Sequence, residues 1–234
     1  MILVPTLNRT KLLANFVRSL HETHVTTPGL ILVDEKDLEK NKAAYAAIEL
    51  PHGWHIKNTG KAVSMGDKLR FVWPKLNSSA WVGLLNDDHY CLTKEWDKKA
   101  SAFLDGTNMI STNDGNWNFG FKVAGLTAWS MPLLEACGFP VFPRNLQHLY
   151  IDDVWKNIGH ATGCWHETLQ INVEHRHVYI GKSEKDETFE KVNAPSSWEY
   201  DAKEFKLFMA EDFKGVCDRV IEFRKDAIAK EKFG

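Results

Sequence analysis

The sequence of 234 residues lacks several patterns that identify common classes of protein. No run of roughly 18 apolar residues occurs, so the sequence predicts no helix that inserts into a membrane. Lysine and arginine number 29, and aspartate and glutamate number 31. The resulting net charge of −2 gives no electrostatic case for binding nucleic acid or anionic membranes. Linkers, internal repeats and low-complexity segments are also absent.

The sequence also lacks closely spaced pairs of cysteines and glycine-rich phosphate-binding loops. The four cysteines have no C-x-x-C spacing, which favours reduced thiols in the cytoplasm over a disulfide framework. An apolar run already begins at Ile2, so we expect no signal peptide and a cytoplasmic protein. Neither G-x-G-x-x-G nor G-x-x-x-x-G-K-[ST] occurs, which excludes the dinucleotide fingerprint and the P-loop.

The N-terminal part of the chain has a β-α-β pattern. Ile2–Val4 is an apolar run that predicts a strand, and apolar residues at helical spacing follow from Leu12 to Leu20. A second apolar run over 29–33 ends in Asp34 and Glu35. Polar groups at the end of each strand are typical of the nucleotide-binding half of an open α/β sheet.

The acidic pair Asp87 and Asp88, preceded by Asn86, is the most informative pattern. It directly follows Trp81–Leu85, an apolar run that predicts a buried strand. Carboxylates at a strand end lie at the sheet edge where α/β folds bind ligands, and such oxygen ligands suit Mg²⁺ or Mn²⁺. Taken alone, the pattern favours an ordinary turn after a strand. The polar clusters elsewhere in the chain favour the metal site.

A second acidic pair, Asp152 and Asp153, lies at the start of a predicted helix that ends at Gly159. Acids in a first helical turn are stabilised by the helix dipole, so capping is one interpretation of this pair. The other is catalysis, because a carboxylate can accept a proton from an attacking hydroxyl.

His175 and His177 alternate along a predicted strand and would therefore point to the same side of it. Two imidazoles on one face favour metal ligation by one of them, and we prefer His175. The alternative is a surface histidine or a hydrogen-bonded core histidine. No third histidine has ligand spacing, which argues against an all-histidine zinc site.

The rest of the chain predicts further elements by periodicity and turn residues. We expect 181–195 to be a flexible loop, and Trp117, Phe119 and Phe121 to face either a substrate or the core. The other expected elements are strands near 54–57 and 109–112 and helices over 36–48, 64–73, 96–103 and from Asp201 onward.

In their order along the chain, these motifs resemble those of the GT-A glycosyltransferases, most closely family 2. Pro5–Arg9 is similar to the Pro-Thr-x-Asn-Arg segment after the first strand of that family. Asp34 matches the Asp that meets the nucleotide base, and Asn86–Asp88 matches the metal-binding D-x-D motif. The first Asp of that motif is Asn86 here, which transfers the ribose contact to Asp87. The resemblance spans roughly the first three quarters of the chain.

The resemblance implies an α/β fold of the GT-A type, with an open mixed sheet flanked by helices and a nucleotide-binding half followed by an acceptor-binding half. It implies one domain over 1–234. Within it, 1–90 bind the nucleotide sugar, 91–200 complete the acceptor and metal sites, and 201–234 form a C-terminal helix. The implied donor-binding residues are Pro5, Thr6, Asn8, Arg9, Asp34, Lys61, Lys68, Asn86 and Asp87.

The implied activity is transfer of a sugar from a nucleotide-diphosphate sugar, preferably a UDP-sugar, to an acceptor hydroxyl, with Mn²⁺ or Mg²⁺ as cofactor. Asp88 would bind the metal with His175 or His177, Asp153 would be the base of an inverting reaction, and Asp152 would contact the sugar or the acceptor. The acceptor is a saccharide or a hydroxymethylated DNA base. A retaining course, a sugar-nucleotide pyrophosphorylase and a non-catalytic nucleotide-sugar-binding domain stay open, although the pyrophosphorylase class opens with a Gly-rich loop that this chain lacks.

Overall fold

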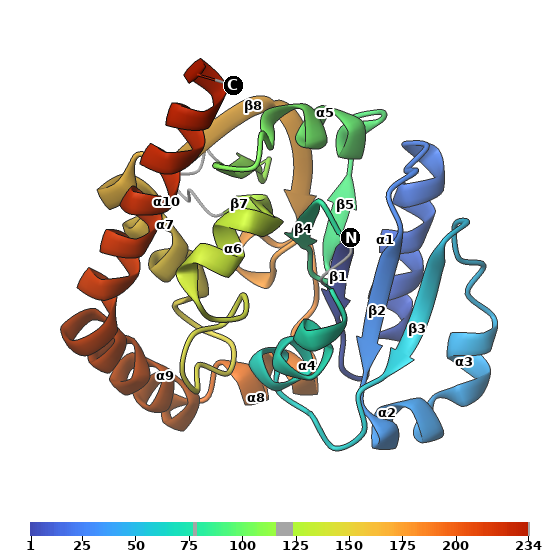
Figure 1. Ribbon diagram of the computed structural model, residues 1–234. Coiled ribbons are helices and arrows are strands. Elements are labelled where there is room, and N and C mark those ends of the chain that lie inside the picture. The colour runs from blue at the N-terminus through green and yellow to red at the C-terminus, as the bar shows by residue number, and fades with distance from the viewer. Residues whose placement is uncertain (77–78, 116–123, 234) are drawn as a thin grey trace.

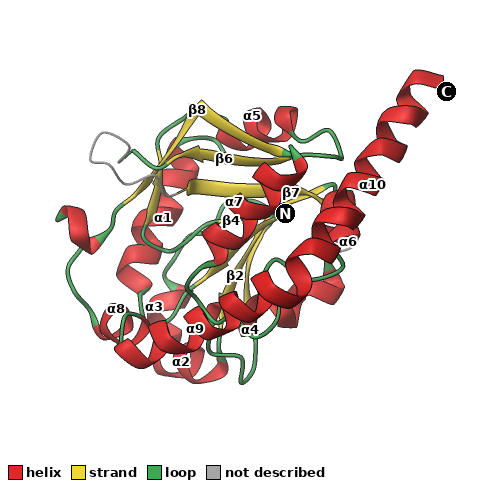
Figure 2. Ribbon diagram, turned by 90° about the vertical axis from the view of Figure 1, so that its left-hand side faces the viewer, coloured by secondary structure: helices red, strands yellow, loops and turns green. Residues whose placement is uncertain are grey.

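The computed structural model describes residues 1–76, 79–115 and 124–233 and has an α/β fold (Figures 1 and 2). These residues form an eight-stranded mixed sheet in the order β3-β2-β1-β4-β7-β6-β8-β5, flanked by helices. The predicted open mixed sheet with flanking helices is confirmed. Trp117, Phe119 and Phe121 lie outside the described residues. The strands are β1 (Ile2–Pro5), β2 (Gly29–Val33), β3 (Trp54–Asn58), β4 (Trp81–Leu84), β5 (His89–Cys91), β6 (Met109–Asn113), β7 (Ala124–Ser130) and β8 (Trp165–His175).

Helices cover both faces of the sheet. The α-helices are α1 (Thr10–Glu22), α2 (Glu35–Lys40), α3 (Lys42–Ala46), α4 (Met65–Val72), α5 (Trp96–Phe103), α6 (Met131–Cys137), α7 (Ile151–Thr162), α8 (Glu187–Val192), α9 (Pro195–Leu207) and α10 (Phe213–Phe233). Shorter turns are η1 (Trp73–Lys75), η3 (Val178–Ile180) and the π-helical η4 (Phe208–Asp212), which joins α9 to α10. The C-terminal end of α10 extends beyond the rest of the molecule (Figure 2).

The parallel half of the sheet brings several strand ends to one edge. β1 pairs in parallel with both β2 and β4, so that Ile2 lies opposite Gly29 on one side and Gly83 on the other. β3 continues the parallel arrangement next to β2. The carboxyl ends of these strands therefore meet at one edge, and the segment with Asp87 and Asp88 leaves β4 there.

The apolar strands are buried on both faces, which explains their uninterrupted hydrophobic runs. Ile2 and Val4 belong to the core cluster that contains the apolar side of α1 and α5, whereas Leu3 belongs to the cluster beneath α4, α6, α7 and α10. Successive side chains of a strand point to opposite faces, so one strand supplies both clusters. In Figure 1 the two helix layers lie on opposite sides of the sheet.

Four local predictions require correction. The helix expected over 36–48 is two short helices, α2 and α3, separated at Asn41. The strand that contains His175 ends there, so His177 lies beyond it. The loop expected over 181–195 contains α8, and the C-terminal helix begins at Pro195 instead of Asp201. Proline is favoured in the first turn of a helix, where its missing N–H has no partner to lose.

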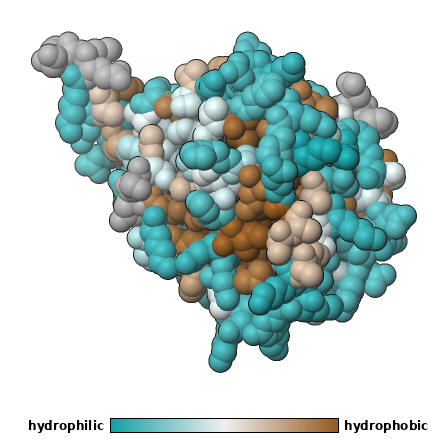
Figure 3. All heavy atoms as spheres, turned by 90° about the vertical axis from the view of Figure 1, so that its right-hand side faces the viewer, coloured by the Kyte–Doolittle hydropathy of each residue, from teal (hydrophilic) through white to brown (hydrophobic). Residues whose placement is uncertain are grey.

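The side of the molecule formed by α1, α2, α3 and β3 is largely hydrophilic, with an apolar area near its centre (Figure 3). A shallow hollow between α1 and α3 includes Ala14, Val17 and Ile48 in its lining. None of the helices in the described part of the chain combines the length and apolar character needed to cross a bilayer.

Candidate nucleotide and metal site

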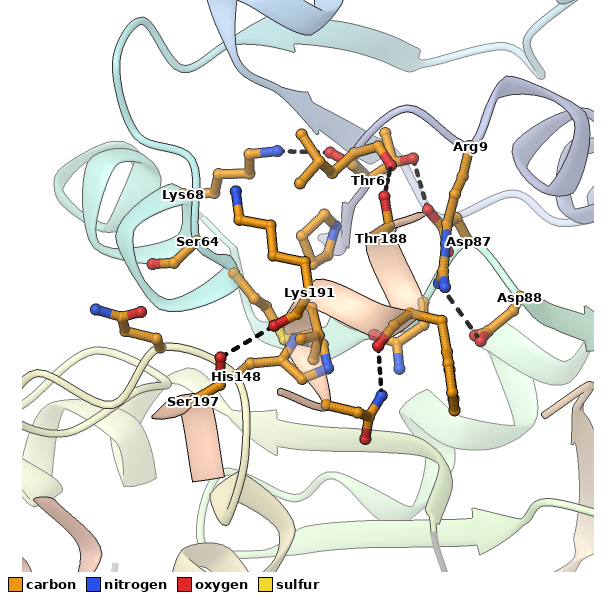
Figure 4. Close-up of a pocket in the computed structure, with 18 of the residues that line it drawn as sticks. Thr6, Arg9, Ser64, Lys68, Asp87, Asp88, His148, Thr188, Lys191 and Ser197 are labelled. Atoms are coloured by element: carbon orange, nitrogen blue, oxygen red, sulfur yellow. Dashed lines mark hydrogen bonds and ion pairs between the residues drawn. The ribbon is translucent and has the colours of Figure 1, made fainter. Parts of the chain in front are cut away.

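A cavity of about 340 Å³ lies at the carboxyl ends of β1 and β4 (Figure 4). Its other walls come from the start of α4, the segment before α7, the end of β8, and α8. The residues singled out from the sequence that line this cavity are Pro5, Thr6, Arg9, Lys68, Asn86, Asp87, Asp88, His175 and His177.

Asp87 is held by the segment that follows β1. The Thr6 hydroxyl donates a hydrogen bond of 2.6 Å to one of its carboxylate oxygens, and Arg9 lies 3.3 Å from the other. Burial and the neighbouring Asp88 raise the pKa of Asp87 to about 7, against the opposing effect of Arg9 and Thr6. These contacts join the segment after β1 to the segment after β4 through polar side chains.

Arg9 forms ion pairs with three carboxylates. Its Nε and Nη2 donate to Asp186 over 2.8 and 2.9 Å, and its Nη1 lies 3.3 Å from Asp87 and 3.8 Å from Asp88. Burial alone would lower the pKa of Arg9, but these acids, Asp186 foremost, outweigh burial and raise it. Arg9 therefore stays charged and joins the acidic pair to the segment that enters α8.

Asp88 lies against His175, the last residue of β8. His175 Nε2 is 3.3 Å from Asp88 Oδ1, and that oxygen is buried and makes no hydrogen bond within the described residues. Burial would raise the pKa of Asp88, yet the nearby His175 and Arg9 hold it well below its usual value. Burial would lower the pKa of His175, but Asp88 outweighs burial and raises it.

Asp88, His89 and His175 could together hold a metal ion, since one potential ligand atom from each lies within 4.8 Å of the others. His89 is the least suited, because its Nδ1 accepts the backbone N–H of Asn86 over 3.2 Å. This hydrogen bond assigns the proton of neutral His89 to Nε2 and leaves no free lone pair. Burial lowers the pKa of His89 to about 3, so it stays neutral. Asp88 and His175 are therefore the better ligands, since the buried Asp88 Oδ1 faces His175 Nε2 over 3.3 Å.

His177 lies beside His175, with ring centroids 5.0 Å apart. The expected closeness of the two rings is present, although it arises from the turn after β8 and not from strand alternation. His177 Nδ1 accepts the backbone N–H of Tyr179 over 3.3 Å at the start of η3, and its ring packs against Phe189 of α8. These contacts give His177 a role in supporting α8.

Lys68, which lines the cavity, forms a buried pair with Asp34, which does not. Lys68 is 1% exposed, and its ammonium lies 3.3 Å from Asp34 and donates to the backbone oxygen of Thr6 over 2.5 Å. Asp34 also caps α2 by accepting the N–H of Asp37. The pair connects α4 to the ends of β1 and β2.

Asn8 and Lys61 are exposed and do not line the cavity. Asn8 has a φ of 55°, in the left-handed region that Asn tolerates, and its backbone N–H donates to Asp37. Lys61 lies in the turn after β3. Neither side chain lies where it would contact a ligand in this cavity.

Asp152 and Asp153 are exposed in the first turn of α7, outside the cavity lining. The Asp152 carboxylate interacts electrostatically with His175. Surrounding protein raises the pKa of Asp152 although solvent reaches its side chain, with His175 acting in the opposite direction.

The segment before α7 is fixed by Asp201, which the sequence indicated only as the start of a helix. Asp201 of α9 is 1% exposed and accepts three backbone N–H groups, those of Gln147, His148 and Leu149. His148 lines the cavity, and burial lowers its pKa to about 4. An isolated Asp in a helical stretch gives no signal of such a contact.

Residues of α8 were also missed. Thr188, Phe189 and Lys191 line the cavity, and Asp186 caps the helix by accepting the N–H of Phe189. A signal was present, because Asp186 followed by Glu187 is a helix-start pattern. The abundance of charged residues around it favoured a loop instead.

No protein-family model matches the chain, and no curated protein matches it in sequence. Among solved structures, a mycobacterial protein aligns over 75% of this chain and 67% of its own, with a TM-score of 0.51 and 11% identity. HddC from Yersinia pseudotuberculosis, in complex with GMP-PN, aligns over 87% of this chain and 98% of its own, with a TM-score of 0.46 and 11% identity. A second structure of HddC gives a TM-score of 0.47 and 10% identity. The mycobacterial protein supports the α/β fold alone, and the lower scores of HddC carry no conclusion.

Proposed function

We propose that the chain is a GT-A-type glycosyltransferase that uses a divalent metal and a nucleotide-diphosphate sugar. The observation that carries this proposal is the Asp88–His175 pair, 3.3 Å apart, in the wall of a cavity at the carboxyl ends of parallel strands. Open α/β sheets bind their ligands at this edge. The order of motifs along the chain and the absence of a P-loop support a nucleotide sugar as the ligand.

The charges of the cavity support a need for metal. Asp87, Asp88 and Asp186 surround the single guanidinium of Arg9, so this corner carries more negative than positive charge when His175 is neutral. A diphosphate would be repelled from such a corner without an added cation. We assign the cation to Asp88 and His175, and the nucleoside contacts to Pro5, Thr6, Asn86 and Asp87. In this proposal Asp34 and Lys68 position the strand ends.

A divalent ion held by Asp88 and His175 would stabilise the negative charge that develops on the leaving diphosphate. The acceptor hydroxyl must lose a proton as it attacks the sugar, and a carboxylate can take that proton. The sequence favoured Asp153 for this role. We now propose Asp152 first, because its charge acts on His175 and its raised pKa strengthens it as a base, and Asp153 second.

Donor hydrolysis and transfer with a panel of UDP-, GDP- and dTDP-sugars, with and without Mn²⁺, test this function. We expect at least one donor to be consumed only with Mn²⁺, and Asp88→Asn to remove that activity while the protein stays folded. Asp226→Asn, which removes the same charge from an exposed position of α10, is the matched control and should behave as the parent.

Other outcomes would redirect the assignment. Formation of a nucleotide sugar from a nucleoside triphosphate and a sugar 1-phosphate would indicate a pyrophosphorylase. Donor binding without any turnover would indicate a binding domain. Full activity of Asp88→Asn would contradict the metal assignment itself.

A further inference from the structure

The basic side chains of the cavity differ in whether they form an ion pair with a carboxylate of the protein. Arg9, Lys68 and Lys191 are the lysines and arginines among its lining residues. Arg9 is paired with Asp186, and Lys68 with Asp34. Lys191 is exposed to solvent and forms no ion pair with any described residue. Its ammonium is therefore available to an anion that enters the cavity.

The backbone of Lys191 is fixed although its side chain is exposed. Thr188 donates from its hydroxyl to the backbone oxygen of Leu7 over 2.8 Å, which attaches α8 to the segment after β1. Phe189 is buried against the ring of His177. The hydroxyl of Ser197 donates to the backbone oxygen of Lys191 itself over 3.0 Å. Contacts on both sides of Lys191 thus hold its backbone at the cavity.

The side chain of Lys191 extends into the cavity from α8 (Figure 4). It reaches toward the side on which Ser64 and Lys68 lie, whereas Asp88 lies on the other side of the view. A ligand in the cavity would therefore meet the carboxylates on one side and the Lys191 ammonium on the other. Lysine has a long flexible stem with three N–H donors, which suits contact with phosphate oxygens.

We propose that Lys191 is the side chain that binds the diphosphate of the donor, whereas the family resemblance placed Arg9, Lys61 and Lys68 among the donor-binding residues. This inference rests on the proposed function. Arg9 instead holds α8 through Asp186, and Lys68 holds the strand ends. Donor binding thus depends on α8, a helix that follows β8 in the chain and contributes a wall of the cavity together with the Lys191 ammonium.

Lys191→Met tests the role of this ammonium, with Lys185→Met as the matched control. Both changes remove one exposed positive charge from the same segment, but Lys185 does not line the cavity. The affinities for UDP and for uridine are measured by calorimetry with Mn²⁺ present. We expect Lys191→Met to weaken UDP binding roughly 10- to 100-fold, the weight of one charge-assisted hydrogen bond, and to leave uridine binding unchanged. The control should bind both ligands as the parent does.

The outcomes separate this inference from the function on which it rests. A parent protein that binds no UDP in the presence of Mn²⁺ overturns both. UDP binding by the parent and by Lys191→Met with equal affinity overturns the role of Lys191 alone. An equal loss of UDP and uridine affinity also overturns it, because Lys191 would then act by holding α8 and not by contact with phosphate.

Discussion

Replacement of Lys68 by methionine should destabilise the fold strongly. Methionine keeps most of the length and the helix propensity of lysine, so the change removes the charge with little loss of packing. In the protein the ammonium is 1% exposed, lies 3.3 Å from Asp34 and donates to the backbone oxygen of Thr6. Asp34 is itself only 2% exposed.

The magnitude follows from what the substitution leaves behind. Lys68→Met leaves the Asp34 carboxylate buried without its counter-charge and the Thr6 carbonyl without its donor. Removal of one partner of a buried ion pair costs about 3–5 kcal/mol of unfolding free energy. Asp34→Asn in the same chain removes the uncompensated charge and keeps an oxygen that can cap α2. We therefore expect the double variant to recover at least half of the loss.

Urea unfolding of the parent, Lys68→Met and the double variant measures these differences. The unfolding free energies should fall in the order parent, double variant, single variant. A loss below about 1 kcal/mol for Lys68→Met would refute the reasoning, since the pair would then contribute no more than an exposed one. A double variant less stable than the single one would refute it equally.

Two further predictions concern the site. The pKa of His175 is raised above the ordinary 6.5, and only neutral His175 can bind metal, so Mn²⁺ affinity should fall by up to about tenfold per pH unit as the pH drops through that raised pKa. His175→Ala should remove this part of the pH dependence when Mn²⁺ binding is measured by calorimetry. An unchanged pH dependence would exclude His175 as a ligand. If Asp152 is the catalytic base, Asp152→Asn should lower the turnover rate by ~10²–10⁴-fold and leave donor affinity unchanged, whereas Asp153→Asn should have a small effect. The reverse pattern in steady-state kinetics would indicate Asp153 as the base.

The parallel half of the fold could be predicted because each of its elements has a recognisable pattern of apolar and polar residues within its own segment. β1, β2 and β4 are buried on both faces and therefore appear in the sequence as short uninterrupted apolar runs that end in polar residues. The apolar stripe of α1 packs in the core as its spacing predicts. The segment Asn86–Asp88 lines the cavity because it follows β4 at the edge where the neighbouring parallel strands also end.

Long-range contacts could not be predicted in the same way. The resemblance placed Lys68 among the donor-binding residues, whereas its burial depends on Asp34, which lies on a different element. β5 is only three residues long and pairs with β8, far along the chain, to place His89 opposite His175. The hydrogen bond that Arg9 donates to Asp186 likewise joins residues 177 positions apart. Such contacts depend on the complete fold and leave no periodic signal in the sequence.

In the proposed function, Asp88 and His175 hold a divalent ion that binds the diphosphate of a nucleotide sugar. A crystal structure of the protein with Mn²⁺ and UDP, with anomalous data collected at the manganese edge, tests this claim most directly. We expect an anomalous peak in contact with Asp88, His175 and the diphosphate, and uridine at the carboxyl ends of β1 and β4. Ordered UDP in this cavity without manganese, or manganese bound elsewhere on the protein, would contradict it.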